Sequence, residues 1–361
     1  MQRRAEFDAL RGLLLVLMAL THLPTRLNGW VDQPLGFVST AEWFVLVSAF
    51  IAGRAYTPLM LERGITYVQQ KLWRRAFELY RLHIVLLLFA VVTAVIVAAA
   101  SGRPGLRNLL SFYFASPGWA ALTAPLLLYQ PPLLDVLPMY ILFLAITPCV
   151  LQASRRFGWS NVLGLSIALW VFAQFGGQMQ LHGMLLSAFP VPPDARGAFD
   201  WLAWQLVWIG GLWLGSARTL RITQPQFAAA IAVCLAFFLW RHGVLDHWLS
   251  AAVAGPWLDK WHLGPLRVIN VIALLMVGQR VILPLLASLR LNGLQLLGRG
   301  SLEAFAAHLV VCILSLNLII NEQTPLSTVQ QIAVVAIAFA AMWLAARKPP
   351  PRINIQRGVL E

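Results

Sequence analysis

The chain has 361 residues, of which 59% are hydrophobic and only 11% charged, and its mean hydropathy is +0.73. Soluble domains average about 45–50% apolar and about 25% charged residues, so this composition excludes a soluble globular domain and indicates an integral membrane protein. The 27 Lys and Arg against 14 Asp and Glu give a net charge of +13. These basic residues are too few and too dispersed for a groove that tracks phosphates, so we expect no nucleic-acid partner.

Ten apolar segments are long enough to cross the hydrocarbon core, which is about 30 Å thick and needs about 20 mostly apolar residues per helix. They lie at roughly residues 8–27, 34–53, 80–101, 132–152, 159–176, 200–217, 225–241, 264–287, 294–320 and 328–346. Prolines interrupt a further apolar segment, 108–130, which favours an interfacial or re-entrant loop. The sequence predicts an all-α polytopic membrane protein, with one transmembrane domain over 1–346 and a basic cytoplasmic tail over 347–361.

The distribution of basic residues predicts the orientation of these spans. The first apolar run, residues 10–23, lacks a small-residue cleavage site, so we expect a retained anchor rather than a cleaved signal peptide. With the N-terminus inside, 20 of the 27 Lys and Arg fall on the cytoplasmic side. Cytoplasmic loops are enriched in Lys and Arg, so this asymmetry predicts that both termini are cytoplasmic. The cysteines lie singly in apolar runs, which predicts neither disulfides nor a metal site: Cys149, Cys234 and Cys312.

The first predicted span carries three basic or titratable side chains on one helical face. At about 100° per residue, His22 lies about 20° from Arg11 around the helix axis, and Arg4 is aligned with His22. His22 also lies about 16 Å deeper than Arg11, roughly half the hydrocarbon thickness. Because ionisable residues within spans are costly, this face predicts an anion-binding end and a buried imidazole. Taken singly, Arg11 also fits a topology-setting flank paired with Asp8, and His22 fits a polar contact between helices.

A basic cluster precedes the third predicted span. It contains Arg74 and Arg75, and Arg74 can pair with Glu78 at i, i+4. One interpretation is a flank that sets the membrane topology. The other is a phosphate clamp, because the planar guanidinium group suits phosphate oxygens.

Further ionisable residues lie within other predicted spans. Glu42 has no partner nearby in the sequence, so it must pair with a distant residue, be protonated or face a cavity. Asp135 begins the fourth span near the outer face, from which it can approach an external substrate. Glu303 follows Arg299 by one turn, which predicts a structural ion pair. His308 lies in the same predicted span as Glu303.

An external loop at about 242–263 combines tryptophans with titratable residues. Tryptophan favours the headgroup level of a membrane, which is the ordinary interpretation, and a sugar-stacking surface is the alternative. The titratable residues resemble a metal site only loosely. The loop contains Trp248, Trp257, Trp261, His242, Asp246, His247, Asp259 and His262.

Several of these motifs occur in an order that resembles the membrane-bound acyltransferase-3 superfamily. The segment Asp8-x-x-Arg11-Gly12, with His22 eleven residues after Arg11, resembles its N-terminal signature. Residues 43–51 look like its second-span motif, with Ala49 where glycine is usual. The remaining matches are the basic motif at 74–75 and a late span at 297–303 with His308.

Two longer segments, residues 73–83 and 135–140, are most similar to the OpgC branch of that superfamily. This branch is associated with succinylation of osmoregulated periplasmic glucans. The resemblance covers nearly the whole chain, and its N-terminal signature is the most specific part.

The resemblance implies an O-acyltransferase of the bacterial inner membrane. It would move a succinyl or acetyl group from cytoplasmic acyl-CoA, a co-substrate rather than a bound cofactor, to a hydroxyl of a periplasmic or cell-surface glycan. His22 would take the hydroxyl proton or carry the acyl group itself, with Glu42 and Asp135 as further catalytic candidates. The residues implied in binding the CoA phosphates are Arg4, Arg11, Arg74 and Arg75, with Asp8 orienting Arg11.

Two other classes of function use the same polar residues differently. A transporter or flippase of a glycan or lipid-linked precursor would use them as a path. The sequence shows neither the inverted repeat nor the paired broken helices that are typical of secondary transporters. A non-catalytic membrane scaffold would leave the shared face of Arg11 and His22 unexplained.

Overall fold

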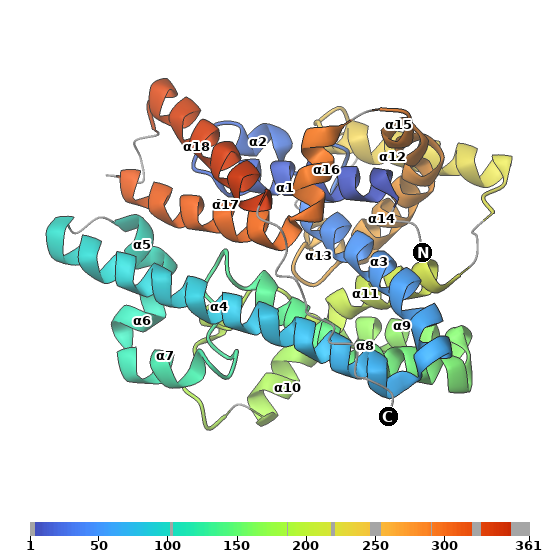
Figure 1. Cartoon of the computed structure of the whole chain (residues 1–361), viewed down its shortest axis with the longest axis horizontal. Helices are drawn as coiled ribbons and strands as arrows, with labels where there is room; N and C mark the ends of the chain where they lie inside the picture. Colours follow the sequence, from blue (N-terminus) through green and yellow to red (C-terminus); the bar gives the residue numbers. More distant parts are fainter. Residues whose placement is uncertain are drawn as a thin grey trace, which may run out of the picture.

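The computed structural model describes residues 4–101, 104–185, 187–217, 221–245, 254–289, 291–319 and 326–347. These residues form a bundle of helices without a β-strand, so the predicted all-α fold is confirmed (Figure 1). The helices are α1 (Ala5–His22), α2 (Asn28–Val31), α3 (Thr40–Arg63), α4 (Ile65–Ser101), α5 (Pro104–Leu109), α6 (Ser111–Ala115), α7 (Pro117–Thr123), α8 (Val136–Phe157), α9 (Trp159–Gln174), α10 (Gly177–Leu185), α11 (Trp201–Ser216), α12 (Gln224–Arg241), α13 (Gly255–Leu258), α14 (Pro265–Val277), α15 (Leu283–Ser288), α16 (Asn292–Arg299), α17 (Ser301–Ser315) and α18 (Thr328–Ala346).

Within these described ranges, seven helices are long and apolar enough to cross a membrane. They are α3, α4, α8, α12, α14 continued through α15, α17 with the turn that follows it, and α18. An eighth span results if α9 and α10, which meet at a bend of 81°, count as one. Each of the ten predicted segments contains at least one helix, including α1, which is more charged, and α11, which has 16 residues. The predicted count of about ten is therefore approximate.

The largest differences from the predicted spans lie in α3, in α4 and at the junction of α16 with α17. α3 continues to Arg63 and α4 begins at Ile65, so both extend well beyond the predicted segments 34–53 and 80–101. Hydropathy marks only the apolar length of a helix, whereas Arg, Lys, Glu and Gln are good helix formers that continue it. The predicted span 294–320 is divided at Gly300 into α16 and α17. Figure 1 shows α16 turned out of the line of α17.

Glycines allow α1 to cross α16 at very short range. A Cβ atom added at Gly12 would lie 1.9 Å from the carbonyl oxygen of Leu294, and one added at Gly298 would lie 1.8 Å from that of Asp8. Small residues at helix crossings let backbones approach closely, and this packing stabilises helix pairs in membranes. The two glycines therefore fix the position of the N-terminal half of α1, which carries Arg11.

Residues 108–130 form no helix of span length. The chain there is divided among the end of α5, α6 and α7, and Pro117 opens α7. Phe112 and Ala120 are buried. The expected interruption of this segment is confirmed, and its position relative to the bilayer stays a prediction.

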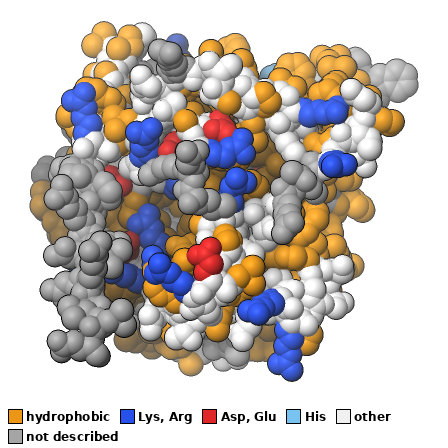
Figure 2. All heavy atoms as spheres, turned by 45° about the vertical axis from the view of Figure 1, so that its right-hand side comes forward, with side chains coloured by type: hydrophobic (Ala, Val, Ile, Leu, Met, Phe, Trp, Pro, Cys, Tyr) orange, Lys and Arg blue, Asp and Glu red, His pale blue; other side chains and the backbone are white. Residues whose placement is uncertain are grey.

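The N-terminal end of α1 and the junction of α3 with α4 lie on the right-hand side in Figure 1, which is the predicted cytoplasmic side. Figure 2 brings this side forward and shows many Lys and Arg side chains and few Asp and Glu among the coloured residues. Lys and Arg are enriched at cytoplasmic membrane surfaces, and the cytoplasmic location of this side stays a prediction.

Candidate functional site

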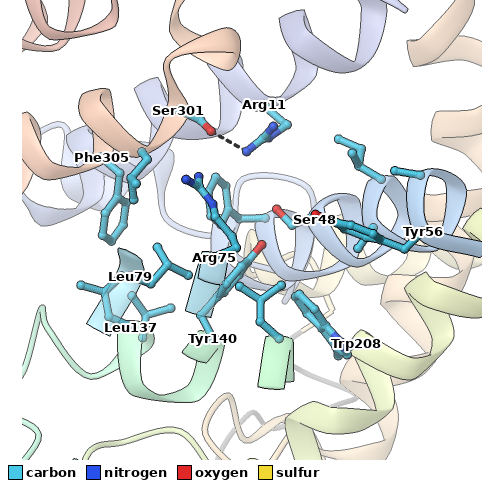
Figure 3. Close-up of a pocket in the computed structure, with 17 residues that line it drawn as sticks. Arg11, Ser48, Tyr56, Arg75, Leu79, Leu137, Tyr140, Trp208, Ser301 and Phe305 are labelled. Carbon is cyan, nitrogen blue, oxygen red and sulfur yellow. Dashed lines mark hydrogen bonds between the residues drawn. The ribbon is translucent and has the colours of Figure 1, made fainter. Parts of the chain in front are cut away.

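A cavity of about 290 Å³ lies inside the bundle, between α1, α3, α4, α8, α11 and α17 (Figure 3). Most of its wall is apolar, and the aromatic rings of Phe44, Trp208 and Phe305 contribute to it. The polar side chains in the wall are those of Arg11, Ser48, Tyr56, Arg75, Tyr140 and Ser301. Binding cavities in proteins are commonly apolar with a few convergent polar groups, so this cavity is the candidate functional site.

Two arginines from different helices point into this cavity. Arg11 comes from α1 and Arg75 from α4, and Figure 3 shows both guanidinium groups directed toward the same region. Arg11 donates a hydrogen bond through Nη2 to Oγ of Ser301, the first residue of α17. Two guanidinium groups at one partly apolar cavity attract a negatively charged group more strongly than they would in water. The arrangement therefore suits an anionic ligand such as a phosphate group.

The two arginines of the basic cluster on α4 lie in different surroundings, one at the surface and one at the cavity. The predicted pair between Arg74 and Glu78 is confirmed, with 3.7 Å between Arg74 Nε and Glu78 Oε1. Arg75 makes the shorter contact, 2.9 Å from its Nη1 to Glu78 Oε2. The Arg74 side chain is 61% exposed and does not line the cavity, whereas Arg75 is 41% exposed and does. Arg75 is thus the member of the cluster that can meet a ligand inside the bundle.

The first turns of α1 differ in part from the prediction. Arg4 is half exposed, contacts the carboxylate of Glu6 and does not line the cavity. The carboxylate of Asp8 lies 3.6 Å from Nε of Arg299, across the α1–α16 crossing. The role of Asp8 in orienting Arg11 stays a prediction, and Arg299 is a partner of Asp8 that the sequence did not predict.

The expected ion pair between Arg299 and Glu303 is absent from the contacts of the described residues. Arg299 ends α16 and Ser301 begins α17, so the i, i+4 geometry of a continuous helix does not apply across Gly300. The guanidinium of Arg299 lies near Asp8 instead. Because the helix is broken at Gly300, the Arg299 side chain contacts α1 rather than the first turn of α17.

His22 ends α1 and meets a second histidine on α17. Nδ1 of His22 lies 3.2 Å from Nε2 of His308, which is completely buried. Two residues of α1 therefore contact α17: Arg11 bonds to Ser301, and His22 bonds to His308. This confirms that Arg11 and His22 share one face of a continuous helix. The sequence included His308 in a motif, but its contact with a residue 286 positions away has no local sequence signal.

Phe305 connects the cavity with the histidine pair. Its ring lines the cavity, and its centroid lies 5.0 Å from that of the His308 ring in an edge-to-face arrangement. Phe44, also in the cavity wall, packs against the ring of Phe305. His308 thus lies next to the wall of the cavity that holds Arg11 and Arg75, and His22 lies beyond it as its hydrogen-bond partner.

Glu42 and Asp135 lie outside the cavity wall. Glu42 is fully buried and pairs with the equally buried Arg267, with 2.9 Å between its Oε1 and Arg267 Nε. Of the three situations that the sequence left open for Glu42, the structure shows pairing with a distant residue. Asp135 is buried just before α8, and its Oδ2 accepts a hydrogen bond from the backbone N–H of Ala198 at 3.1 Å. Their catalytic assignments stay predictions.

The predicted external loop contains one titratable pair among its described residues. Oδ1 of Asp259 lies 3.0 Å from Nδ1 of His262, and this hydrogen bond raises the pKa of His262 above its usual value of 6.5. Trp257 is exposed at the surface. Within the described part of the chain, no three His, Cys, Asp or Glu side chains are close enough to hold a metal ion. Asp246, His247 and Trp248 lie outside the described residues.

The family comparison covers nearly the whole chain. A family model described as OpgC protein matches residues 3–349. The chain belongs to the OpgC protein family. Comparisons with curated proteins and with solved structures gave no match. Membership of the OpgC family implies a membrane protein with an acyltransferase-like function.

Proposed function

We propose that this OpgC-family protein transfers an acyl group, succinyl or acetyl, from cytoplasmic acyl-CoA to a hydroxyl of a periplasmic or cell-surface glycan. One observation carries the proposal. The cavity that receives two guanidinium groups, from Arg11 and Arg75, is also lined by a phenylalanine that packs against His308, the partner of His22. A region that can bind an anion and a group that can accept a proton thus lie near one aromatic residue.

The cavity suits the pantetheine arm of acyl-CoA and the phosphates at its end. Its lining residues on α3 extend from Phe44 to Tyr56, which corresponds to about 18 Å at 1.5 Å per residue. Arg11 and Arg75 would bind phosphate oxygens through charge-assisted hydrogen bonds. The more exposed Arg74 would meet the nucleotide end of the donor, and the apolar wall would exclude water from the thioester. Arg4 and Asp8 would act indirectly, by holding the N-terminal turns of α1.

The histidine pair suits proton transfer from the acceptor. A sugar hydroxyl is a poor nucleophile at neutral pH, and a positioned imidazole that removes its proton typically contributes 10²–10⁴-fold to the rate. In the proposed step, His22 takes the hydroxyl proton while the oxygen attacks the thioester carbonyl carbon. The tetrahedral intermediate collapses by cleavage of the carbon–sulfur bond, and the departing thiolate of CoA takes the proton back from His22. The products are the acyl ester and free CoA.

An activity assay on the purified protein in lipid vesicles tests this proposal. Radiolabelled succinyl-CoA and acetyl-CoA are supplied with an oligosaccharide acceptor, and both free CoA and labelled glycan are measured. We expect both products in equal amounts, and His22→Ala should abolish their formation. The proposal fails if neither product forms, or if His22→Ala retains full activity. Movement of the glycan across the vesicle membrane without CoA release would instead identify a transporter.

Comparison of glycans from cells with and without the gene identifies the substrates. Mass spectrometry of periplasmic and surface glycans should show one acyl substituent that is lost in the deletion strain. The mass of that substituent identifies the acyl group, and the glycan that carries it identifies the acceptor. Identical glycan masses in the two strains would contradict the proposed reaction.

A further inference from the structure

The contact between His22 and His308 is a hydrogen bond in the plane of the two rings. Their ring centroids are 5.5 Å apart, the rings are inclined by only 19°, and the two facing nitrogens are 3.2 Å apart. A ring nitrogen lies about 1.1 Å from the centroid of an imidazole, given carbon–nitrogen bonds of about 1.35 Å. The centroid distance is therefore close to the nitrogen separation plus these two radii. The two nitrogens must lie nearly on the line between the rings, which excludes face-to-face stacking.

An in-plane contact between two neutral imidazoles needs one proton between them. A neutral imidazole has one donor nitrogen and one acceptor nitrogen. Either His22 donates from Nδ1 to Nε2 of His308, or His308 donates in the opposite direction. The first case leaves Nε2 of His22 unprotonated, and the second places a proton on that nitrogen. Only the first case gives His22 a free lone pair with which to take a proton from a substrate.

The proposed role of His22 selects between these two cases. Nδ1 of His22 faces His308, so Nε2 is the ring nitrogen left to meet a substrate. A general base needs an unprotonated nitrogen, so the proton of His22 must lie on Nδ1. Nε2 of His308 then accepts the hydrogen bond, and the proton of His308 lies on its own Nδ1.

We propose that His308 is a positioning residue that holds His22 in the tautomer protonated on Nδ1, so that Nε2 of His22 is the reacting nitrogen. The inference rests on the proposed acyl transfer and deepens it. His308 is completely buried and packs edge-on against Phe305, so its ring is fixed. When His22 accepts the substrate proton on Nε2, its Nδ1–H bond to His308 becomes charge-assisted and strengthens. His308 thus stabilises the imidazolium that forms during the reaction without touching the substrate.

Solid-state NMR of the full-length protein, labelled with ¹⁵N in the histidine rings and held in lipid vesicles, tests the tautomer directly. The His22 signals are identified as those lost in His22→Gln. We expect the wild-type protein to show His22 protonated on Nδ1, and His308→Leu to remove this preference. Wild-type His22 protonated on Nε2 would overturn the inference. This measurement requires no acyl transfer, so it separates the inference from the proposed function, which the absence of any transfer would refute.

Kinetics of three variants test the positioning role. His308→Leu should lower kcat about 10- to 100-fold, the range for loss of one hydrogen bond to a charged group. The apparent KM for acyl-CoA should stay within about twofold, because His308 lies outside the arginine cavity. His308→Gln, whose side-chain oxygen can accept the Nδ1–H bond, should restore part of kcat. His83→Leu is the matched control, since His83 is also completely buried and neither ring nitrogen has a hydrogen-bond partner among the described residues.

Thermal unfolding of the two leucine variants separates a loss of stability from a loss of catalysis. His308→Leu and His83→Leu each remove a buried imidazole, so a general loss of stability affects both and appears in their thermal unfolding. A similar kcat loss in both variants would overturn the inference, as would a His308→Leu protein with wild-type kcat. Recovery in His308→Gln, together with a normal His83→Leu enzyme, would support it.

Discussion

Substitution of Gly12 by alanine tests how tightly the site depends on the crossing of α1 with α16. The added Cβ atom would lie 1.9 Å from the carbonyl oxygen of Leu294, which is backbone and cannot rotate away. Ordinary van der Waals contact begins at about 3.4 Å. The two helices must therefore separate by about 1.5 Å at this point. Gly12 directly follows Arg11, so the separation moves the guanidinium that contacts Ser301.

The expected cost follows from this displacement. Overpacking of a tight contact typically destabilises a protein by about 1–3 kcal/mol. A misplacement of about 1 Å at a reacting group can lower the rate about 10²-fold. Because α1 carries both Arg11 and His22, we expect Gly12→Ala to lower the thermal unfolding temperature, raise the KM for acyl-CoA and lower kcat together.

Gly293→Ala provides the matched control. Gly293 lies on α16 directly before Leu294, but a Cβ atom there would have nothing within 4 Å. Alanine also favours a helix over glycine by up to about 1 kcal/mol, so this variant should be neutral or slightly more stable. Thermal unfolding in detergent and acyl-transfer kinetics are measured for both variants. A Gly12→Ala protein with the stability and kinetics of Gly293→Ala would refute the close crossing and the role assigned to it.

Three further predictions concern charged residues. Arg75→Ala should raise the apparent KM for acyl-CoA more than Arg74→Ala does, because only Arg75 lines the cavity; equal effects in steady-state kinetics would contradict this placement. Arg267→Leu should destabilise the protein by about 3–5 kcal/mol in unfolding experiments, because it leaves the carboxylate of a buried ion pair uncompensated; an unchanged unfolding midpoint would argue against the pair. The hydrogen bond that the His262 ring donates to Asp259 raises the pKa of His262, so the stability from this pair is present in full below about pH 6.5 and is lost as the pH rises through the raised pKa. An NMR titration of His262 should show a lower midpoint in Asp259→Asn, and an unchanged midpoint would contradict the assigned cause.

Local periodicity predicts the parts of the site that lie on one helix. Arg11 and His22 were placed on a shared face because the regular turn of an α-helix fixes angles along a continuous segment. The structure keeps residues 5–22 in one helix, so the calculation applies. The pair between Arg74 and Glu78 was predicted for the same reason, since both lie within α4.

Contacts between helices could not be predicted in this way. The sequence showed that Glu42 needs a partner, but Arg267 is far away in the chain, and only the packing of α3 near α14 brings the two charges together. For Glu303, the sequence predicted a partner that the described part of the structure does not show. Its spacing from Arg299 predicted an ion pair, yet the helix is broken at Gly300, and no hydropathy pattern marks that break.

The position of Phe305 bears on whether the protein leaks protons and ions across the membrane. A protein that passes an acyl group across a membrane must not open a continuous water path, because protons and ions would then leak down their gradients. Phe305 lines the cavity that holds Arg11 and Arg75, and its ring packs against the buried His308. Phe44 packs against the same ring, so in the proposed reaction the two rings would form an apolar barrier between the donor cavity and the histidines. The same two rings that shape the end of the donor cavity would thereby preserve the membrane potential during turnover.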